Sequence, residues 1–359
     1  MSCISSIQHQ VLDVPLLEPF GIATGAQLVA QNVLVKVTLE DGTVGLGEAA
    51  PFPAVNGENQ AQVLATLPAL ATRLTGQSIL KLRPLAEQAR GVLSTTPSAL
   101  AAAEMALLDA WAKRANVPMW SFFGGSETAL RTDITIVTGS VAHAIDAAQR
   151  ASAAGFDLLK LKIGGADLDH DLARVRAIAA TCPQARFILD ANASFTSDEA
   201  LTMLSALGDL VGRVVLFEQP TAAGNIDELA RVTRDGGVLV AADESARSVA
   251  DVVAIAKHNA AQVINIKTMK TGVFAAWDMM VAARAFGLQL MVGGMVETEL
   301  SMSVSACLGG GFGGVRFFDL DTPLFMGPRP LVGGFVQQGP AIDLRGIVAG
   351  HGVRQPAER

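Results

Sequence analysis

The 359-residue sequence predicts an α/β fold, a barrel of the (β/α)₈ class preceded by a smaller α+β region. Between Leu158 and Lys267, five short apolar runs each end in a charged residue, at steps of 28, 28, 25 and 24 residues. A strand, a helix and two loops need about that length, because a parallel crossover has to include a helix. The runs are almost wholly apolar, as expected of strands buried on both faces. The charged residues that end them are Lys162, Asp190, Glu218, Asp243 and Lys267.

The first part of the chain, residues 1–125, predicts an α+β region. The segment Asn32–Leu39 alternates between apolar and polar residues, and Thr43–Glu48 returns after a short turn, which is typical of an antiparallel hairpin. A helical pattern follows over residues 60–116. The segment Pro19–Gln27 contains two glycines and is expected to be a mobile loop.

Residues 126–325 predict the barrel. The remaining strands and the first helix are expected at Asp133–Thr138, Val141–Ala154, Gln289–Gly294 and Val315–Asp321. The unit after the last strand lacks a long helical pattern, so the barrel is expected to be of the (β/α)₇β type. The Gly- and Pro-rich tail, residues 326–359, is expected to pack back on the N-terminal region.

Composition excludes several classes of protein. Half of the residues are apolar and 17% are charged, which argues against disorder. The net charge of −7 and the lack of a basic run argue against nucleic acid as a partner. No apolar run approaches the ~20 residues of a membrane span, and no secretory signal is visible. The three cysteines are far apart without metal-ligand spacing, so we expect reduced thiols and a cytoplasmic location.

Three carboxylates at consecutive strand ends indicate a metal site. The carboxyl ends of barrel strands converge on one face, where Asp190, Glu218 and Asp243 would supply hard oxygen ligands. Such a set suits Mg²⁺ and leaves positions for water and substrate. The alternative is that each is an exposed loop carboxylate, which is less favoured because all three end consecutive strands.

The lysines indicate proton transfer. Lys160 and Lys162 are two residues apart and therefore point to the same face of a strand, the barrel interior. A second ammonium and a divalent ion nearby should lower the pKa of a lysine in this place, so Lys162 could act as a base. Lys267 would project from across the barrel mouth, so that one lysine deprotonates a carbon acid and the other reprotonates it from the opposite face. A carboxylate on Mg²⁺ can be stabilised as an enediolate once its α-proton leaves. The alternative is a purely structural ion-pair network.

Five motifs together resemble the enolase superfamily, in particular its muconate-lactonising subgroup. They are Lys160-Leu161-Lys162, Asp190-Ala191-Asn192, Glu218-Gln219-Pro220, Asp243-Glu244-Ser245 and Asn265-Ile266-Lys267. The resemblance runs along nearly the whole chain. It implies a (β/α)₇β-type TIM barrel, a Mg²⁺-assisted two-lysine site, and a capping domain formed by the N-terminal region and the tail. In that domain Gly47–Ala49 is similar to the second specificity loop of the family. We also expect a homo-oligomer.

The resemblance leaves four reactions open, and strand eight favours one of them. The four are muconate cycloisomerase, o-succinylbenzoate synthase, N-acylamino acid racemase and dipeptide epimerase. Asp319 and Asp321 lie on one face of their strand and call for a cationic partner, for which the α-ammonium of a dipeptide is suited. The segments Phe318–Leu324 and Met295–Thr298 resemble those of dipeptide epimerases of the L-Ala-D/L-Glu type. Solvated loop acids are the alternative. The resemblance thus implies an isomerase in which Lys162 and Lys267 exchange the α-proton and Lys160 stabilises the developing charge.

The side chain of the second substrate residue is harder to infer. Family members that act on Ala-Glu have a basic residue in the first capping loop, whereas no Lys or Arg precedes Lys36 here. An apolar second residue is favoured by Phe20, Ile22, Phe52 and Val55, and a cationic one could be accepted by Glu58 or Glu299. The full set of expected substrate contacts is Asp319, Asp321, Thr135, Met295, Glu297, Thr298, Phe20 and Thr24.

The run Gly309–Gly314 satisfies the glycine pattern of a dinucleotide-binding loop. It follows a helical pattern and precedes a strand, which is the reverse of the required context. We therefore interpret it as a flexible helix-to-strand connection.

Overall fold

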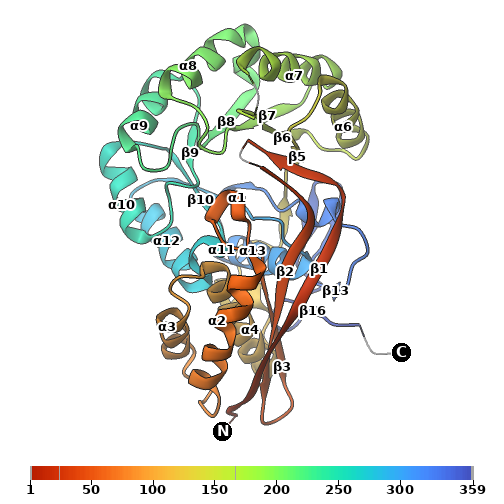
Figure 1. The fold of residues 1–359 in the computed structure, drawn as a ribbon, viewed down its shortest axis with the longest axis vertical. Helices are drawn as coiled ribbons and strands as arrows, with labels where there is room; N and C mark the ends of the chain where they lie inside the picture. Colours follow the sequence, from red (N-terminus) through yellow and green to blue (C-terminus); the bar gives the residue numbers. More distant parts are fainter. Residues whose placement is uncertain (1, 24, 166, 357–359) are drawn as a thin grey trace.

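Eight parallel strands form a curled sheet in the order β12-β11-β10-β9-β8-β7-β6-β5 (Figure 1). The structure is a computed structural model that describes residues 2–23, 25–165 and 167–356. The strands are β5 (Ile134–Ile136), β6 (Leu158–Lys162), β7 (Arg186–Asp190), β8 (Val214–Glu218), β9 (Val240–Ala242), β10 (Val263–Ile266), β11 (Gln289–Val292) and β12 (Val315–Phe318). The edges meet where the backbone N–H of Asp133 donates to the carbonyl oxygen of Phe318 at 3.0 Å.

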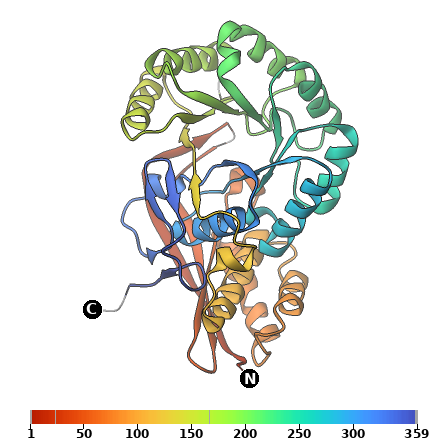
Figure 2. The same ribbon diagram turned by 180° about the vertical axis from the view of Figure 1, so that it is seen from behind.

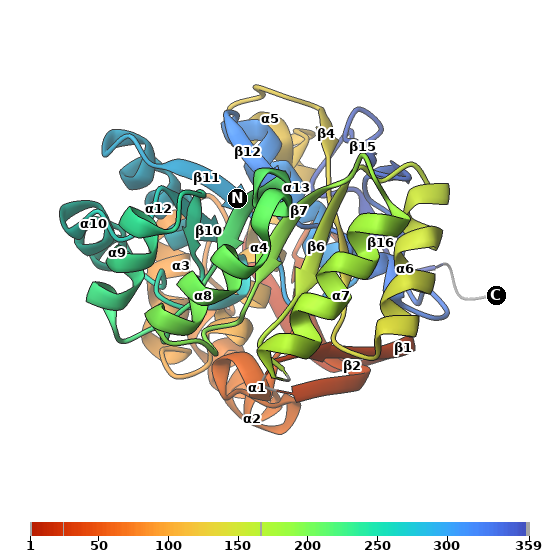
Figure 3. The same ribbon diagram turned by 90° about the horizontal axis from the view of Figure 1, so that it is seen from above.

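Helices cover the outside of this sheet (Figure 3). They are α6 (Val141–Ala153), α7 (Leu168–Thr181), α8 (Ser197–Ala206), η1 (Gly208–Arg213), α9 (Ile226–Asp235), α10 (Val249–His258), α11 (Thr268–Thr271), α12 (Val273–Ala285) and α13 (Glu299–Phe312). In the described residues after β12, the helical element is the short 3₁₀ helix η2 (Thr322–Phe325). The (β/α)₇β fold class is therefore confirmed.

An apolar layer fills the inside of the barrel beneath the polar residues. Ile188, Leu216, Ala241, Val263, Met291 and Phe317 form a cluster of their own, separate from the main core. Side chains of a strand alternate between its two faces, so the next inward position on each strand is two residues further on. On β7, β8 and β12 those positions are Asp190, Glu218 and Asp319, and Asp243 follows β9 in the same way. The apolar layer thus supports a polar layer at the carboxyl ends of the strands.

The N-terminal region is a three-stranded antiparallel sheet with helices against it. Its elements are β1 (Ile4–Ile22), β2 (Gly25–Leu39), β3 (Val44–Ala49), α1 (Pro53–Asn56), α2 (Gln60–Leu74), α3 (Leu82–Val92), α4 (Pro97–Ala115), α5 (Met119–Phe122) and β4 (Ala129–Arg131). The predicted specificity loop Gly47–Ala49 is wrong, because these residues lie in β3, packed against α4. A Cβ at Gly47 would lie 1.9 Å from the carbonyl oxygen of Ala102, so only glycine permits this approach.

The prediction of a mobile loop over Pro19–Gln27 is also wrong. Strand β1 continues to Ile22 and β2 begins at Gly25, so the segment is the end of a long hairpin that reaches the barrel (Figure 1). The N–H of Thr138, just after β5, donates to the carbonyl oxygen of Gly21 at 3.2 Å. A Cβ at Gly21 would lie 2.5 Å from Oγ1 of Thr138, so glycine allows the hairpin to dock there.

The C-terminal tail returns to the N-terminal region (Figure 2). Its strands are β13 (Val332–Gly333), β14 (Val336–Gln338), β15 (Ala341–Asp343) and β16 (Val353–Arg354), and β15 pairs with β4. His351 is fully buried, and its Nε2 lies 3.0 Å from the carbonyl oxygen of Leu46. Its backbone N–H donates to Asp109 of α4 at 3.1 Å.

The glycine run is not the flexible connection that its sequence predicts. Residues Gly309–Gly311 belong to the last turns of α13 and are fully buried. A Cβ at Gly311 would lie 2.3 Å from the carbonyl oxygen of Trp120, and one at Gly309 would lie 2.5 Å from the ring of Phe318. The glycines serve close helix packing. Among the described residues, no helix is both long and apolar enough to cross a bilayer.

Candidate active site

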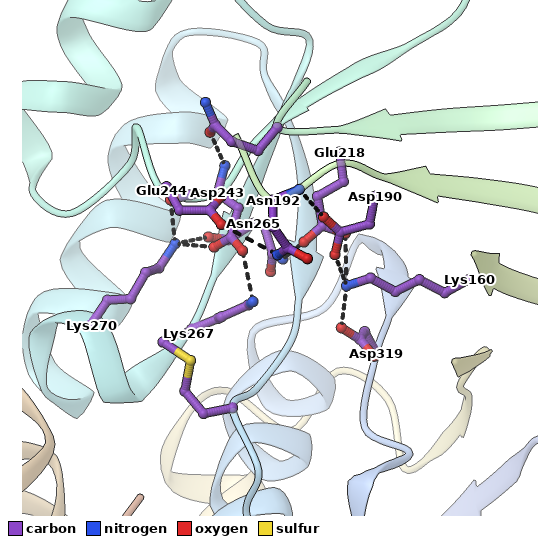
Figure 4. A network of polar contacts seen from close by, with 12 residues as sticks. Lys160, Asp190, Asn192, Glu218, Asp243, Glu244, Asn265, Lys267, Lys270 and Asp319 are labelled. Carbon is purple, nitrogen blue, oxygen red and sulfur yellow. Dashed lines mark hydrogen bonds and ion pairs between the residues drawn. The ribbon is translucent and has the colours of Figure 1, made fainter. Parts of the chain in front are cut away.

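Lys160 joins several carboxylates of the buried polar layer (Figure 4). Its Nζ lies 3.0 Å from Asp190, 2.9 Å from Glu218 and 2.7 Å from Asp319. The side chain is 1% exposed. A buried ammonium is tolerated only when its charge is compensated, and here three carboxylates do so.

Lys162 and Lys267 stand on opposite walls of the barrel. Lys162 ends β6 and Lys267 follows β10, and three strands separate β6 from β10 in either direction around the barrel. Lys162 donates to Asp190 at 2.6 Å, and Lys267 donates to Asp243 at 2.7 Å. Both lysines line one small cavity. Gly293 leaves room for this arrangement, because a Cβ there would lie 3.2 Å from Cε of Lys267.

Lys270 is a site residue that the sequence reasoning missed. It comes three residues after Lys267, in the single turn α11, and its Nζ donates to Oδ1 and the carbonyl oxygen of Asp243, both at 2.7 Å. Figure 4 shows Asp243 between Lys267 and Lys270. Asn265 was also missed, and its amide donates to Glu218 at 2.8 Å. The signal for both was their spacing of two and three residues from Lys267.

Carboxylates raise the pKa of two of the lysines, and the lowering expected beside a bound divalent ion stays a prediction. Burial lowers the pKa of Lys267, but Asp243 and Glu218 raise it, and the net pKa lies above its ordinary value. For Lys160, burial likewise lowers the pKa, and the three neighbouring carboxylates raise it well above its usual range. Adjacent carboxylates outweigh the effect of other ammonium groups. The purely structural alternative, an ion-pair network, is thus present in the structure.

The carboxylates respond according to their nearest partner. Burial raises the pKa of Asp190, but Lys160, Lys162 and Lys267 lower it below its ordinary value. Asp243 is lowered in the same way, with Lys267 and Lys270 outweighing burial. Burial and the charge of Asp190 raise the pKa of Glu218 to about 7.

Two sets of acids could hold a cation. The predicted set of Asp190, Glu218 and Asp243 comes from β7, β8 and the end of β9, and it offers buried hard oxygens that fit Mg²⁺. A second set is Asp133, Asp319 and Asp321. Among the described residues, only this second set has ligand atoms all within 4.8 Å of one another.

The position of the two sets around the barrel distinguishes them. Strands β7, β8 and β9 fill the arc between β6 and β10, so the predicted set lies between the two strands that carry Lys162 and Lys267. The second set lies on the opposite arc, at β12 and β5. A metal on the first arc would be flanked by the two lysines, which is why the donor set of β7 to β9 fits the predicted role better.

The backbone bends sharply just after two of the acids. Asn192 and Ala193 follow Asp190 with φ values of 42° and 64°, and Gln219 follows Glu218 with a φ of 33°. Such left-handed conformations are strained for residues other than glycine and cluster at functional sites. They turn the chain away from the barrel mouth, and the side chain of Asn192 lines the cavity.

The cavity combines the lysines with an apolar wall. Phe20 and Ile22 at the hairpin end, together with Phe52 and Val55, face the barrel residues across it. These four are the side chains that the sequence reasoning assigned to an apolar substrate group. The barrel residues that line it are Thr135, Lys162, Asn192, Lys267, Gly294, Met295, Asp319 and Thr322. Thr24, also predicted, lies outside the described residues.

Three predicted contacts do not line the cavity, namely Asp321, Glu297 and Thr298. Glu297 is fully buried and accepts hydrogen bonds from the N–H of Met295 at 2.5 Å and from the hydroxyl of Ser301. Thr298 caps the start of α13 and donates to Glu48 at 2.6 Å. Glu297 and Thr298 hold the loop after β11 in place, and direct contact of the three residues with substrate stays a prediction.

The acids suggested for a cationic substrate side chain are engaged elsewhere. Glu58 accepts from the backbone N–H of Ser98 at 3.2 Å, and Glu299 pairs with Arg329 at 2.8 Å. Neither lines the cavity, which leaves the apolar wall as the feature that faces the substrate. Asp321 is fully buried behind the cavity, and its Oδ2 accepts the backbone N–H of Thr135 at 2.5 Å.

The fold and this arrangement of lysines and acids define a member of the enolase superfamily. The family model for the mandelate racemase/muconate lactonizing enzyme N-terminal domain matches residues 6–124, and the model for the enolase C-terminal domain-like fold matches residues 143–353. The chain belongs to this family.

Its relatives include dipeptide epimerases. An aromatic dipeptide epimerase from Herpetosiphon aurantiacus is 46% identical over 350 residues, which cover 98% of each chain. The substrate-liganded L-Ala-D/L-Glu epimerase of Bacillus subtilis superposes with a TM-score of 0.95 at 30% identity, over 99% of this chain and 100% of that one. The dipeptide epimerase of Enterococcus faecalis V583, complexed with Mg and L-Leu-L-Tyr, gives a TM-score of 0.94 at 29% identity, over 98% and 100%.

Proposed function

We propose that the chain is a Mg²⁺-dependent dipeptide epimerase, an isomerase that inverts the α-carbon of the second residue of an L-Ala-Xaa dipeptide. The observation that carries this proposal is the placement of four groups around one barrel. Carboxylates occupy β7 to β9, acids for an ammonium occupy the arc of β12 and β5, and Lys162 and Lys267 stand on the two walls between. A dipeptide that spans the two arcs presents its second α-carbon to both lysines.

Asp190, Glu218 and Asp243 would hold the metal. When bound, Mg²⁺ would neutralise the negative charge that develops on the substrate carboxylate as the α-proton leaves. Lys160 adds a fixed positive charge at 2.9 to 3.0 Å from two of these acids. We assign to it the stabilisation of the same developing charge.

The proton moves between the two lysines and the α-carbon. One lysine must be neutral to accept the α-proton from one face, and the other must be protonated to return a proton to the opposite face. Lys162 and Lys267 are assigned these roles, and they exchange them when the opposite epimer is bound. Their position on opposite walls supports the assignment.

The apolar wall supports an apolar or aromatic second residue. Phe20, Ile22, Phe52 and Val55 line the cavity. Apart from Lys162 and Lys267, no described side chain that lines it carries a positive charge that could pair with a carboxylate on the substrate side chain. The similarity to an aromatic dipeptide epimerase agrees with this preference. Asp319 and Asp321 would receive the α-ammonium. A muconate, a succinylbenzoate or an acylamino acid carries no ammonium, so two acids there disfavour the cycloisomerase, synthase and acylamino acid racemase alternatives.

Two further expectations remain predictions of the same proposal. The three cysteines are unpaired, as thiols of a reducing compartment would be, which supports the predicted cytoplasmic location. A homo-oligomer is likewise still predicted.

Deuterium exchange tests the function. The enzyme with Mg²⁺ is incubated in D₂O with a library of L-Ala-L-Xaa dipeptides, and mass spectrometry follows the second α-carbon. We expect incorporation of one deuterium, greatest for apolar and aromatic second residues. Lack of deuterium at that carbon in every library member would overturn the proposal, and the same library incubated without the protein is the control for exchange without enzyme chemistry.

A further inference from the structure

One buried carboxylate in the barrel has no assigned role. Asp133 precedes β5, is fully buried, and both of its carboxylate oxygens lack a hydrogen-bond partner in the part of the chain that the structure describes. An unpaired buried carboxylate is strongly unfavourable, so such a group calls for a missing partner.

The unpaired group lies beside Asp319 and Asp321. One oxygen from each of the three acids lies within 4.8 Å of the others. Of the three, Asp319 has a cation, since Lys160 lies 2.7 Å from its Oδ2. Asp321 has one oxygen satisfied by the N–H of Thr135, and its Oδ1 has no hydrogen-bond partner among the described residues.

The unfilled oxygens match a primary ammonium. Two oxygens of Asp133 and one of Asp321 lack a hydrogen-bond partner among the described residues, and an alkylammonium has three N–H donors. One oxygen from each of Asp133, Asp319 and Asp321 lies within 4.8 Å of the other two, so a single nitrogen can approach all three at about 2.8 Å, the length of a charge-assisted hydrogen bond.

The three acids lie next to the cavity wall. Thr135 and Asp319 line the cavity, and Asp133 and Asp321 each lie two residues along the chain from one of them. We infer that Asp133 is a third carboxylate of the pocket for the dipeptide's α-ammonium. The inference rests on the proposed function and adds a residue that selects substrates with a free amino terminus.

The charges around Asp133 are mostly negative. The groups that face it are Asp319, Asp321, Lys160 and Glu218, of which Lys160 is positive and shared with other acids. Burial, followed by the charges of Asp319 and Asp321, raises the pKa of Asp133 well above its ordinary value. An ammonium among these acids would offset their mutual repulsion.

Two substrates and one variant test the inference on the Mg²⁺-loaded enzyme. The substrates are L-Ala-L-Phe and propionyl-L-phenylalanine, which has hydrogen in place of the ammonium. The variant is Asp133→Asn, which has nearly the same shape as the protonated acid but cannot release a proton. Glu104→Gln, a second fully buried acid, located in α4, is the control for loss of a buried carboxyl.

We expect Asp133→Asn to raise KM for L-Ala-L-Phe at least about tenfold, with kcat changed less than about threefold. KM for propionyl-L-phenylalanine should stay unchanged, so discrimination between the two substrates falls by the same factor. Binding of Mg²⁺ alone should be the same in the variant and the wild type.

Unchanged discrimination in a folded Asp133→Asn enzyme would overturn the inference. A crystal structure of the wild-type enzyme with Mg²⁺ and L-Ala-L-Phe is independent of whether the variant folds. It supports the inference if the ammonium nitrogen contacts Asp133, and overturns it if only Asp319 and Asp321 bind that nitrogen. Failure of the wild-type enzyme to turn over any dipeptide would remove the proposed function as well, whereas turnover with unaltered discrimination in the variant removes the role of Asp133 alone.

Discussion

Glu218 and Asp319 project from opposite sides of the barrel, at β8 and β12, and both contact Nζ of Lys160, at 2.9 and 2.7 Å. One ammonium therefore joins the two halves of the site, the half assigned to the substrate carboxylate and the half assigned to its ammonium. A change of charge in one half therefore alters the electrostatic environment of the other half through Lys160. Several consequences of this arrangement can be measured.

Replacement of Lys160 by methionine should leave three buried acids without their shared cation. We expect the free energy of unfolding without metal to fall by about 3–5 kcal/mol, the usual cost of breaking a buried ion pair. Added Mg²⁺ should restore part of the loss, because it supplies positive charge to Asp190 and Glu218. Urea denaturation with and without Mg²⁺ measures both effects. Lys257→Met, at an exposed position of α10, is the control, and an equal loss in both variants would contradict the role of Lys160.

The two lysines should differ in the epimer from which each removes the α-proton. With Lys162→Ala and Lys267→Ala, net epimerisation should fall at least about 1,000-fold in each, because one of two proton-transfer groups is lost. Each variant should retain α-deuterium exchange with one epimer of L-Ala-Phe and lose it with the other, and the two should have opposite preferences. Proton NMR in D₂O gives both rates. If both variants lost exchange with the same epimer, the lysines would act on one face, contrary to the proposal.

Metal affinity should depend on the acids of β7 to β9. Glu218→Gln removes one anionic ligand of three and should weaken Mg²⁺ binding at least about 100-fold. Isothermal titration calorimetry measures the affinity, and removal of Mg²⁺ by a chelator should abolish turnover until the metal is returned. Glu104→Gln removes a buried carboxyl from α4 and should bind Mg²⁺ as the wild type does. Equal affinity in Glu218→Gln would place the metal elsewhere.

Substrate preference should respond to the hairpin end. Ile22 lines the cavity and is 4% exposed, so Ile22→Arg would place a guanidinium beside the second substrate residue. We expect kcat/KM for L-Ala-L-Glu relative to L-Ala-L-Phe to rise at least about tenfold, because a buried ion pair forms with the glutamate side chain. Leu17→Arg lies on the same strand at a site that is 71% exposed, and it should leave the ratio unchanged. If both arginine variants gave a similar ratio, Ile22 would not determine the preference for the second substrate residue.

Stability should depend on pH through Glu104. Burial raises the pKa of this carboxyl to about 7, whereas its ordinary value is 4.5. A raised pKa in the folded state gives a stabilising contribution that is present below pH 4.5 and is lost as the pH rises through 7. Glu104→Gln should remove this dependence. The unfolding free energy of the variant minus that of the wild type should therefore increase between pH 5 and pH 8, by at most roughly 3 kcal/mol. Glu87→Gln, at an exposed position of α3, controls for the change in net charge, and parallel profiles for wild type and Glu104→Gln would contradict the prediction.

The barrel and its strand-end residues could be predicted because each follows from a local pattern. Apolar runs set the strands, and the alternation of faces places Asp190 and Glu218 two residues beyond Ile188 and Leu216. The apolar character of the cavity wall could be predicted, because Phe20, Ile22, Phe52 and Val55 are apolar residues. The strand conformation of the hairpin end could not, because the long pairing of β1 with β2 overrides the loop signals of Gly21 and Gly25.

Asp133 could not be found from the sequence alone. It is a single acid before a short strand, and only the stagger of the barrel brings it level with Asp319, two residues beyond Phe317 of the neighbouring strand. The hydrogen bonds of Thr298 were also out of reach, since their partner Glu48 lies 250 residues away in the chain. Long-range geometry of this kind has no local signature.

The hairpin end docks on the barrel through Gly21 and Thr138, so two separate parts of the chain line one cavity. The groups that move the proton stand on a rigid cylinder, while Phe20 and Ile22 arrive from a different part of the chain. Mutations at the hairpin end can therefore change the preferred substrate side chain while the lysines and acids of the barrel stay in place. Proteins that descend from this one could thus differ in substrate and keep the same reaction.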